Sequence, residues 1–529
     1  MKYTQLFHKA KTRQSQPIAG SGQTRNSAGG YGWDVDRWEM LDRFLILGSE
    51  TGTVYVAAQK LTADHARNVI EAIKDDGVRA VARIVEVSTR SLAPKNDAAV
   101  FALALAAAHG DEKTRKAAFD AVSQVCRTGT HLFAFADACD SLRGWGRGLR
   151  RAVGNWYNAQ SAEDLAYGLV KYQIREGWSH RDLLRLAHPV AATPDHDALF
   201  QWAVSKELKA DIPLVSAVLA LRQAKDLDTV CELIREFRIP REAVPTEMLT
   251  EPRVWEALLD DMPLTAMLRN LGNLSKLGVL RKSLFGAHSP GVDKVVSTLE
   301  NPVRLRKSRV HPVAVLAALT TYASGRGFRG DGSWKPVQRV VDALDRAFYD
   351  SFANVEPTGK RIVLALDVSG SMAGTLVAGV VGLDCRRACG AMALATAASE
   401  KSASFLAFDT SVYPLAIDGS MRLDTVASLL AKTGGGGTDC AAPIQHMVKK
   451  KVEADAIILY TDSETWYGSQ HPAEAMADYR RKVNRNAKLV VVAMASNRTS
   501  VADPLDPLTL NVVGFDATVP NLIAQFVNA

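Results

Sequence analysis

The motif Asp367-Val-Ser-Gly-Ser371 constrains the fold of this chain more than any other stretch. It follows the apolar residues 362–366, which come after the turn signal Pro357-Thr-Gly-Lys360 and are typical of a short buried strand. In an open parallel sheet, ligand sites lie just beyond the carboxyl ends of the strands. A carboxylate and two hydroxyls at alternate positions there can converge on a hard cation, because such ions take oxygen ligands. The motif therefore predicts a metal site on an α/β domain.

Strand and helix patterns alternate from residue 356 to residue 529, which is typical of a doubly wound α/β domain. The strands are expected at residues 361–367, 403–408, 454–461, 488–494 and 511–514. The helices are expected at residues 383–400, 422–432, 440–451 and 472–483.

Two further loops of this domain carry oxygen ligands. Residues 434–439 form a glycine loop that presents the hydroxyl of Thr438 just before an expected helix. Residues 456–461 read as a buried strand that ends at Asp462. Both loops are therefore expected beside the first motif, where they can supply further ligands to the same cation.

These three loops together resemble the metal-ion-dependent adhesion site of von Willebrand factor A domains. The resemblance implies that Ser369, Ser371 and Thr438 coordinate a divalent cation, with Mg2+ the expected ion. It also implies that Asp367 and Asp462 reach the ion directly or through water.

The chain before this domain has a different texture, in which helix-forming segments follow one another from residue 33 to about residue 350. Residues 98–108 and 116–125 carry apolar side chains at three- and four-residue steps, and similar segments recur as far as residue 322. Short loops with Gly, Pro or Asp separate them, which predicts an α-solenoid of the HEAT kind over residues 31–355. Residues 1–30 are polar and contain basic but no acidic side chains, which predicts a flexible basic arm.

The net charge of +7 is unevenly distributed along the 529 residues. Residues 356–529 hold 16 of the 64 basic and 17 of the 57 acidic side chains, so the whole excess comes from residues 1–355. A basic half favours a polyanionic partner, although basic surfaces can also be merely solvated.

The composition also bears on where the protein works. The six cysteines are scattered, which favours reduced thiols in a cytoplasmic protein. No apolar run is long enough to span a bilayer and the N-terminus lacks a signal-peptide core, so we expect no membrane partner.

Two neighbouring segments of the helical region carry basic side chains. Lys171 and Arg175 lie four residues apart in an expected helix over residues 164–176, so they would share one face. Ser179 and Asp182 form a capping box that starts a second helix, on which Arg181, Arg185 and His188 would share a face. Both stripes could bind phosphate, or could be ordinary solvated faces.

A weaker cluster of Arg127, Thr130 and His131 follows the expected helix over residues 122–127. It could bind phosphate in the same way, but His131 taken alone reads more readily as a structural histidine.

Several longer motifs make the chain similar to the Ro autoantigen family. In the helical region they are Tyr31-Gly-Trp, Val125-Cys-Arg127, Thr130-His-Leu-Phe, Lys171-Tyr, Gly177-Trp-Ser-His and Met262-Pro-Leu-Thr-Ala-Met-Leu-Arg-Asn-Leu-Gly272, which resemble its TROVE module. In the α/β domain they are Glu356-Pro-Thr-Gly-Lys360, Gly436-Gly-Thr-Asp-Cys440 and Thr461-Asp-Ser-Glu-Thr465. The simple chain fits a bacterial member of the family.

The resemblance implies a ring of HEAT-like helices, closed by a von Willebrand factor A domain, around a positively charged hole. It implies that small non-coding Y RNAs bind the outer surface and that single-stranded 3′ ends of misfolded RNAs enter the hole. The family's Y RNA contacts match Lys171, Arg175 and His188. We therefore expect an RNA-binding protein of RNA quality control, not an enzyme, and an exoribonuclease is a possible partner of such a ring.

Two other classes of function stay open from the residues alone. A metal-dependent protein-binding scaffold would use the α/β site to capture an acidic side chain of a partner. A metal-assisted hydrolase would use Asp367, Asp462 and an ion to activate water, but no general base stands nearby in the sequence.

Overall fold

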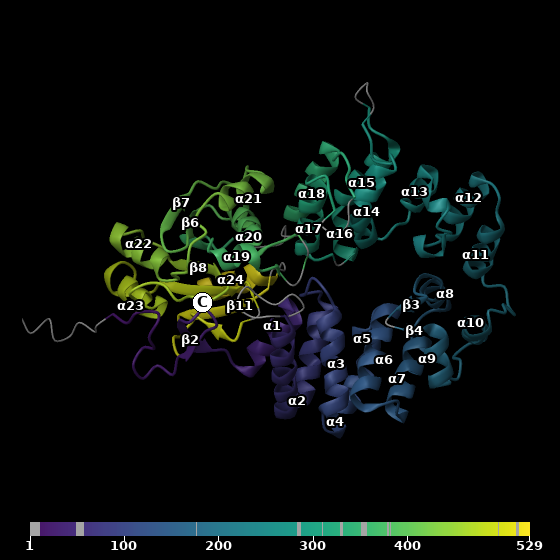
Figure 1. The fold of residues 1–529 in the computed structure, drawn as a ribbon, viewed down its shortest axis with the longest axis horizontal. Helices are drawn as coiled ribbons and strands as arrows, with labels where there is room; N and C mark the ends of the chain where they lie inside the picture. The colour runs from purple at the N-terminus through teal and green to yellow at the C-terminus, as the bar shows by residue number, and fades with distance from the viewer. Residues whose placement is uncertain are drawn as a thin grey trace, which may run out of the picture.

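The chain forms an arc of helices whose two ends meet an α/β domain (Figure 1). The structure is a computed structural model that describes residues 11–529 except 49–57, 176, 283–286, 309, 328–331, 351–356, 378–379, 381, 496 and 515–517. The expected boundary between helical and α/β regions, at residues 355 and 356, lies outside the described residues.

The helices of the arc follow one another with short connections. Within the described residues, one short strand pair precedes them and a second one interrupts them. They are α1 Arg37–Leu47, α2 Ala58–Thr89, α3 Asp97–His109, α4 Glu112–Asp120, α5 Val122–Val125, α6 Gly129–Arg143, α7 Arg147–Asn158, α8 Ala162–Lys171, α9 His180–Ala187, α10 Pro194–Ser205, α11 Pro213–Gln223, α12 Leu227–Phe237, η2 Arg241–Ala243, η3 Met248–Thr250, α13 Pro252–Leu258, α14 Leu264–Lys276, α15 Pro290–Leu299, α16 Pro302–Ser308, α17 Pro312–Ala323 and α18 Gln338–Asp350. The strand pairs are β1 Thr24–Arg25 with β2 Tyr31–Asp34, and β3 Ile174–Arg175 with β4 Trp178–Ser179.

Local sequence explains where many of these helices begin. The side chain of Thr193 accepts a hydrogen bond from His196 N at the start of α10, and Pro194 occupies the first turn, where it costs no hydrogen bond. The alanine-rich helix α3 packs against both α2 and α6, and small side chains permit this close approach on more than one face.

The α/β domain is built on a six-stranded sheet in the order β11-β9-β8-β5-β6-β7. Its strands are β5 Ile362–Asp367, β6 Ala403–Phe408, β7 Val412–Leu415, β8 Ala456–Thr461, β9 Lys488–Ala493 and β11 Thr509–Val513. Its helices are α19 Gly370–Gly374, α20 Cys385–Ser399, α21 Leu423–Ala431, α22 Ala442–Lys450, α23 Pro472–Lys482 and α24 Thr518–Asn528. All strands are parallel except β7, which pairs antiparallel with β6 at the edge.

The sheet is covered on both faces, which explains why its central strands are continuously apolar. Ile362, Leu364 and Leu366 of β5 pack into one core cluster, whereas Val363 and Ala365 pack into a second cluster on the opposite face. The expected strands and the doubly wound class are therefore confirmed, and β7 and the two-residue β10 Thr499–Ser500 are additions.

Residues 11–34 run across the α/β domain rather than into solvent. Strand β2 pairs antiparallel with β10, with Asp34 opposite Thr499, and the side chain of Gln14 is fully buried. The flexible arm expected for residues 1–30 is therefore wrong for residues 11–30, because polar side chains of this segment hydrogen-bond to the domain. Residues 1–10 lie outside the described residues.

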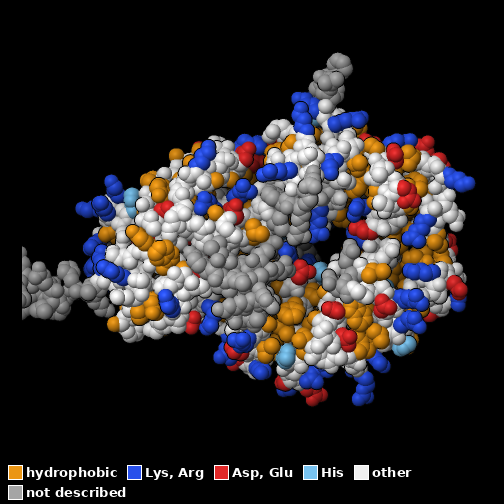
Figure 2. All heavy atoms as spheres, in the orientation of Figure 1, with side chains coloured by type: hydrophobic (Ala, Val, Ile, Leu, Met, Phe, Trp, Pro, Cys, Tyr) orange, Lys and Arg blue, Asp and Glu red, His pale blue; other side chains and the backbone are white. Residues whose placement is uncertain are grey.

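Both ends of the helical arc contact the α/β domain. At one end, Asn511 of β11 donates a hydrogen bond to Glu39 of α1, and at the other, Arg422 before α21 pairs with Asp342 of α18 at 2.7 Å. Figure 2 shows an opening between the two limbs of the arc, with Lys and Arg side chains at its edge. Among the described helices, none is both long and apolar enough to cross a membrane.

Candidate functional site

The predicted metal-binding motif begins at the carboxyl end of the central strand β5. Leu366 of β5 lies opposite Tyr460 of β8, so Asp367 and Asp462 emerge side by side at the same edge of the sheet. Asp367 Oδ1 accepts a hydrogen bond from Ser369 N at 2.9 Å, and its Oδ2 accepts one from Thr461 Oγ1 at 2.7 Å. The carboxylate is thereby fixed in one orientation.

The glycine loop brings Thr438 to the same place. Gly370 N donates to Gly436 O at 3.0 Å, which joins the glycine loop to the first motif. Gly434 and Gly435 have φ angles of 66° and 115°, a region that favours glycine. Asp409, which directly follows β6, supports the loop by accepting a hydrogen bond from Gly436 N at 3.0 Å.

The structure brings all five predicted metal ligands together in a buried cluster. These residues are 0% to 4% exposed: Asp367, Ser369, Ser371, Thr438 and Asp462. Ser369 Oγ lies 3.1 Å from Ser371 Oγ. Within the described part of the chain, the buried hydroxyl of Thr438 has no hydrogen-bond partner.

Electrostatics also suits a cation at this cluster. Burial, followed by the neighbouring charge of Asp462, raises the pKa of Asp367 above its ordinary value. Burial likewise raises the pKa of Asp462, although Ser371 and Glu464 N hydrogen-bond to it. A hard cation would offset the cost of burying two negatively charged carboxylates, and it would also give the Thr438 hydroxyl a partner. The donor set therefore fits such an ion.

Sequence reasoning missed several residues that support the cluster. Asp409 could have been found as the carboxylate that ends the second parallel strand. Glu464 is 1% exposed, and its Oε2 accepts a hydrogen bond from Ala28 N at 2.9 Å. No local sequence pattern around Gln14 or Ala28 predicts that these residues contact partners more than 400 residues away along the chain.

The predicted RNA-binding helices differ in one respect from the expectation. Helix α8 ends at Lys171, and Arg175 lies in the hairpin β3–β4, opposite Trp178. The expectation that Lys171 and Arg175 share a helix face is therefore wrong. The physical reason is a hairpin turn at Gly177, which has a φ of 76° and replaces the last helical turn. The side chain of Arg175 lies outside the described residues.

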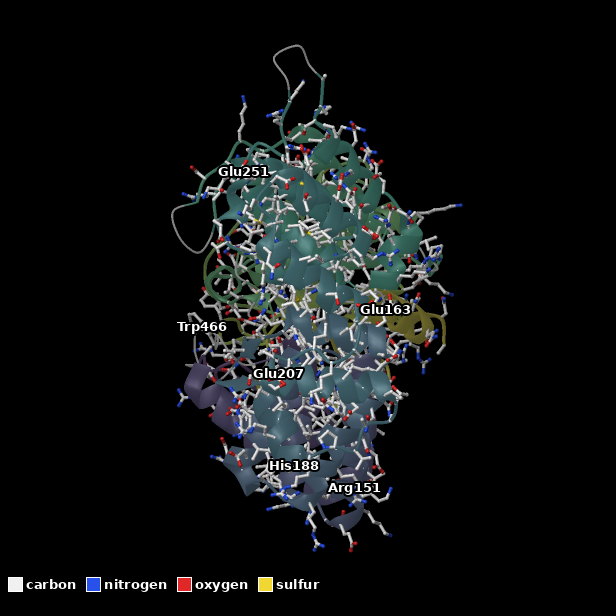
Figure 3. All side chains as sticks on the ribbon, turned by 90° about the vertical axis from the view of Figure 1, so that its right-hand side faces the viewer. Arg151, Glu163, His188, Glu207, Glu251 and Trp466 are labelled. Carbon is white, nitrogen blue, oxygen red and sulfur yellow. The ribbon has the colours of Figure 1, made fainter. Side chains whose placement is uncertain are left out.

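Helix α9 agrees with the expectation. Ser179 and Asp182 form the capping box, and Arg181, Arg185 and His188 are exposed. His188 ends the helix in the left-handed conformation with a φ of 47°. In Figure 3, His188 lies on the side of the arc that faces the viewer.

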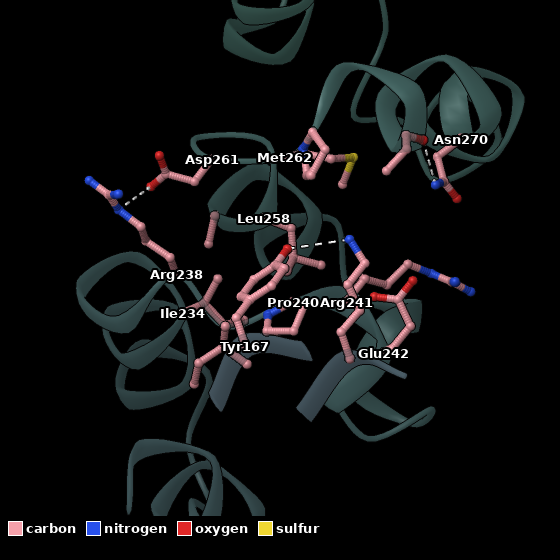
Figure 4. Close-up of a pocket in the computed structure, with 15 residues that line it drawn as sticks. Tyr167, Ile234, Arg238, Pro240, Arg241, Glu242, Leu258, Asp261, Met262 and Asn270 are labelled. Atoms are coloured by element: carbon pink, nitrogen blue, oxygen red, sulfur yellow. Dashed lines mark hydrogen bonds and ion pairs between the residues drawn. The ribbon is translucent and has the colours of Figure 1, made fainter. Parts of the chain in front are cut away.

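Lys171 lies beside a pocket that the sequence did not predict (Figure 4). Its Nζ stands 5.2 Å from the ring centroid of Tyr167 and 5.6 Å from that of Tyr172, which are cation–π distances. Arg238 and Arg241 also line this pocket, together with two acidic side chains. Lys171 Nζ also donates a hydrogen bond to the Tyr167 hydroxyl at 3.4 Å, so the pocket combines a tyrosine with three basic and two acidic side chains.

Arg127, Thr130 and His131 lie where α5 meets α6. Arg127 is exposed, whereas Thr130 and His131 are only partly exposed in the first turn of α6. Burial lowers the pKa of His131 to about 4, and its Nδ1 lies 3.4 Å from Asn96 Nδ2. His131 is therefore uncharged near neutral pH and contacts Asn96, as expected for a structural histidine.

The fold and the buried oxygen cluster define a class of protein in which a helical arc is closed by a von Willebrand factor A domain. Residues 24–212 and 238–322 match the TROVE domain, and residues 361–527 match the Ro60 vWA domain. The chain belongs to the Ro60 family.

Two relatives and one solved structure show how far the likeness extends. The chain is 40% identical to the RNA-binding protein RO60 of Deinococcus radiodurans over 509 residues, which cover 95% of each chain. It is 33% identical to the RNA-binding protein RO60 of Caenorhabditis elegans, over 97% of this chain and 91% of that protein. The crystal structure of the Deinococcus radiodurans RO (RSR) protein matches with a TM-score of 0.71 at 39% identity, covering 93% of this chain and 99% of that chain.

Proposed function

We propose that this chain binds RNA through its helical arc. The observation that carries the proposal is the 40% identity to a Deinococcus radiodurans protein that is named RNA-binding, along 95% of both chains. The basic excess of residues 1–355 supports it, because phosphate neutralisation supplies most of the affinity of such proteins.

The finer proposal assigns two kinds of RNA to two surfaces. A small Y RNA would bind the outer surface through Lys171, Arg175, Arg185 and His188, with weaker contacts from Arg127, Thr130 and the uncharged His131. The exposure of Arg185 and His188 supports this assignment, as does the pocket lined by Lys171, Arg238 and Arg241, in which basic side chains outnumber the two acidic ones. Single-stranded 3′ ends of misfolded RNA would enter the opening seen in Figure 2, because RNA is read best where bases are unpaired.

Crosslinking in cells, followed by sequencing of the attached RNA, tests this function. We expect one abundant small RNA together with RNAs that end in single-stranded 3′ tails. A broad sample in proportion to RNA length and abundance would contradict the proposal and indicate generic basic binding.

We further propose that Ser369, Ser371, Thr438, Asp367 and Asp462 hold a divalent cation, with Mg2+ the expected ion. The ion would supply a fixed positive charge that can accept an oxygen ligand from a partner. Mg2+ or Mn2+ should raise the midpoint of thermal unfolding of the wild type, Asp367→Ala should abolish this shift, and the exposed-site control Asp418→Ala should keep it. An equal shift in wild type and Asp367→Ala would contradict the metal site.

A second function, metal-dependent capture of a protein partner, is favoured by two exposed aromatic side chains beside the cluster. Trp466 and Tyr467 are 39% and 48% exposed, and their backbone N–H groups donate to Thr438 O at 3.2 and 3.1 Å. An acidic side chain of the partner would reach the cation while a neighbouring apolar side chain packs on this aromatic pair.

A further inference from the structure

The two loops that flank the metal cluster are themselves held by a segment from the opposite end of the chain. Gln14 Nε2 donates to Asp439 Oδ1 at 2.5 Å and to Gln470 O at 2.9 Å. Gln14 Oε1 accepts a hydrogen bond from Thr465 Oγ1. All three bonds go to these loops, and the side chain of Gln14 is 0% exposed. Burying an amide is costly without such partners, so this contact is a specific one.

A short path of bonds leads from Gln14 to the metal ligands. Asp439 directly follows Thr438, so the bond to Asp439 restrains the backbone that carries the Thr438 hydroxyl. Thr438 O accepts a hydrogen bond from Trp466 N at 3.2 Å, and Trp466 directly follows Thr465, which is three residues beyond Asp462. Gln14 thus joins the loop of Thr438 to the loop of Asp462.

The neighbouring residues of the segment hold Gln14 in this position. Gln14 N donates to Gly468 O at 3.2 Å, and Tyr31 N donates to Gln14 O at 3.0 Å. Asn26 Nδ2 donates to Thr465 O at 2.6 Å. At Gly30 a Cβ atom would lie 1.9 Å from Thr465 O, so only glycine permits this close approach.

We propose that Gln14 is a positioning residue of the metal site, and that docking of residues 11–34 and binding of the cation favour each other. The docked segment fixes the relative position of Thr438 and Asp462, so a cation finds its ligands already arranged. By thermodynamic reciprocity, the cation must then hold the segment more firmly. This inference rests on the metal site proposed above.

Mn2+ titrations of the full-length chain test the inference. Gln14→Ala should raise the Kd for Mn2+ about 10-fold or more, which is the usual effect of losing a group that orients ligands. The matched control is Gln16→Ala, since Gln16 is exposed on the same segment and bonds there through its main chain, which the substitution keeps: Gln16 O lies 2.7 Å from His471 Nε2, and Gln16 N donates to Arg13 O at 2.9 Å. Gln14→Met, which keeps the length of the side chain but not its hydrogen bonds, should behave like Gln14→Ala. Wild-type Mn2+ affinity in both Gln14 variants would overturn the inference.

Hydrogen exchange in the wild type gives a second readout that needs no variant to fold. Mn2+ should slow hydrogen exchange at two amides of the docked segment: that of Gln14, which donates to Gly468 O, and that of Tyr31, which donates to Gln14 O. Unchanged exchange at these amides while Mn2+ binds would overturn the coupling. Failure of the wild type to bind Mn2+ at all would instead refute the metal site, and the inference with it.

Discussion

The guanidinium of Arg43 in α1 donates a hydrogen bond to the main-chain oxygen of Thr499 in β10 at 3.2 Å. Arg43 is completely buried, it also donates to Asn497 O, and it pairs with Glu39 at 2.8 Å. The contact joins the first helix of the arc to the α/β domain, so it helps to close the chain on itself.

Arg43→Met should loosen this closure. We expect a loss of about 3 kcal/mol in stability, because the substitution leaves buried carbonyl oxygens without donors. Small-angle scattering should show a larger radius of gyration, and thermal unfolding should begin at a lower temperature. The control is Arg37→Met. Arg37 pairs with Asp75, and both side chains are about half exposed, so we expect the stability to change by less than about 1 kcal/mol. Equal effects of the two substitutions would show that Arg43 is not a closure contact.

The sequence predicted the α/β domain well because its signals are local. Continuous apolar strands and the oxygen-bearing residues that follow them, such as Asp367 and Asp462, can be read from a few consecutive positions. Closure by Arg43 and docking of Gln14 could not be predicted, because each depends on partners more than 400 residues away. The helix expected over residues 164–176 was wrong only beyond Lys171, for a different reason: the turn at Gly177 and the pairing of Arg175 with Trp178 outweighed local helix propensity.

Acid should destabilise the helical arc through His180. Burial lowers the pKa of this histidine to about 3, and its Nδ1 lies 2.8 Å from the hydroxyl of Tyr157. Because the ordinary pKa is near 6.5, the unfolded chain binds a proton that the folded chain does not, so the stability contribution is full above pH 6.5 and is lost as the pH falls toward 3. At pH 5 the loss should be about 2 kcal/mol.

The variant His180→Asn separates this effect from general acid unfolding. It removes the titrating ring but keeps a polar group near Tyr157, so it should be less stable than wild type at pH 7 and should lose less stability on going to pH 5. Denaturant unfolding at the two pH values measures both differences. An equal loss in wild type and variant would assign the acid sensitivity to other groups.

The aromatic pair Trp466 and Tyr467 should matter for a protein partner but not for RNA. Affinity capture with nuclease treatment should retain this partner, and chelation of divalent ions should release it. Trp466→Ala should weaken its binding by about 2 kcal/mol, the usual size of an interface hot spot. The control Leu505→Ala removes another exposed apolar side chain, which is 86% exposed. A partner that leaves on nuclease treatment would instead be bound through RNA.

The contribution of Lys171 to RNA binding can be read from its salt dependence. Lys171→Ala should weaken binding of a small Y-like RNA and reduce the slope of log K against log salt concentration by about 1, since one phosphate contact is lost. Lys113 is exposed on α4 and is not one of the predicted contacts, so Lys113→Ala is the charge-matched control. Filter binding at several salt concentrations measures both slopes, and identical slopes in the two variants would remove Lys171 from the RNA site.

Competition between two RNAs tests whether the outer surface gates the opening. If a Y-like RNA held at Lys171 and Arg175 obstructs the entrance, it should reduce binding of a misfolded RNA with a single-stranded 3′ tail. The double variant Lys171→Ala/Arg175→Ala should no longer hold the Y-like RNA firmly, so the tailed RNA should bind equally well with or without it. Lys113→Ala should keep the competition, because its charge change lies elsewhere. Competition that persists unchanged in the double variant would mean that the two RNAs share one surface, and that the outer site does not act as a gate.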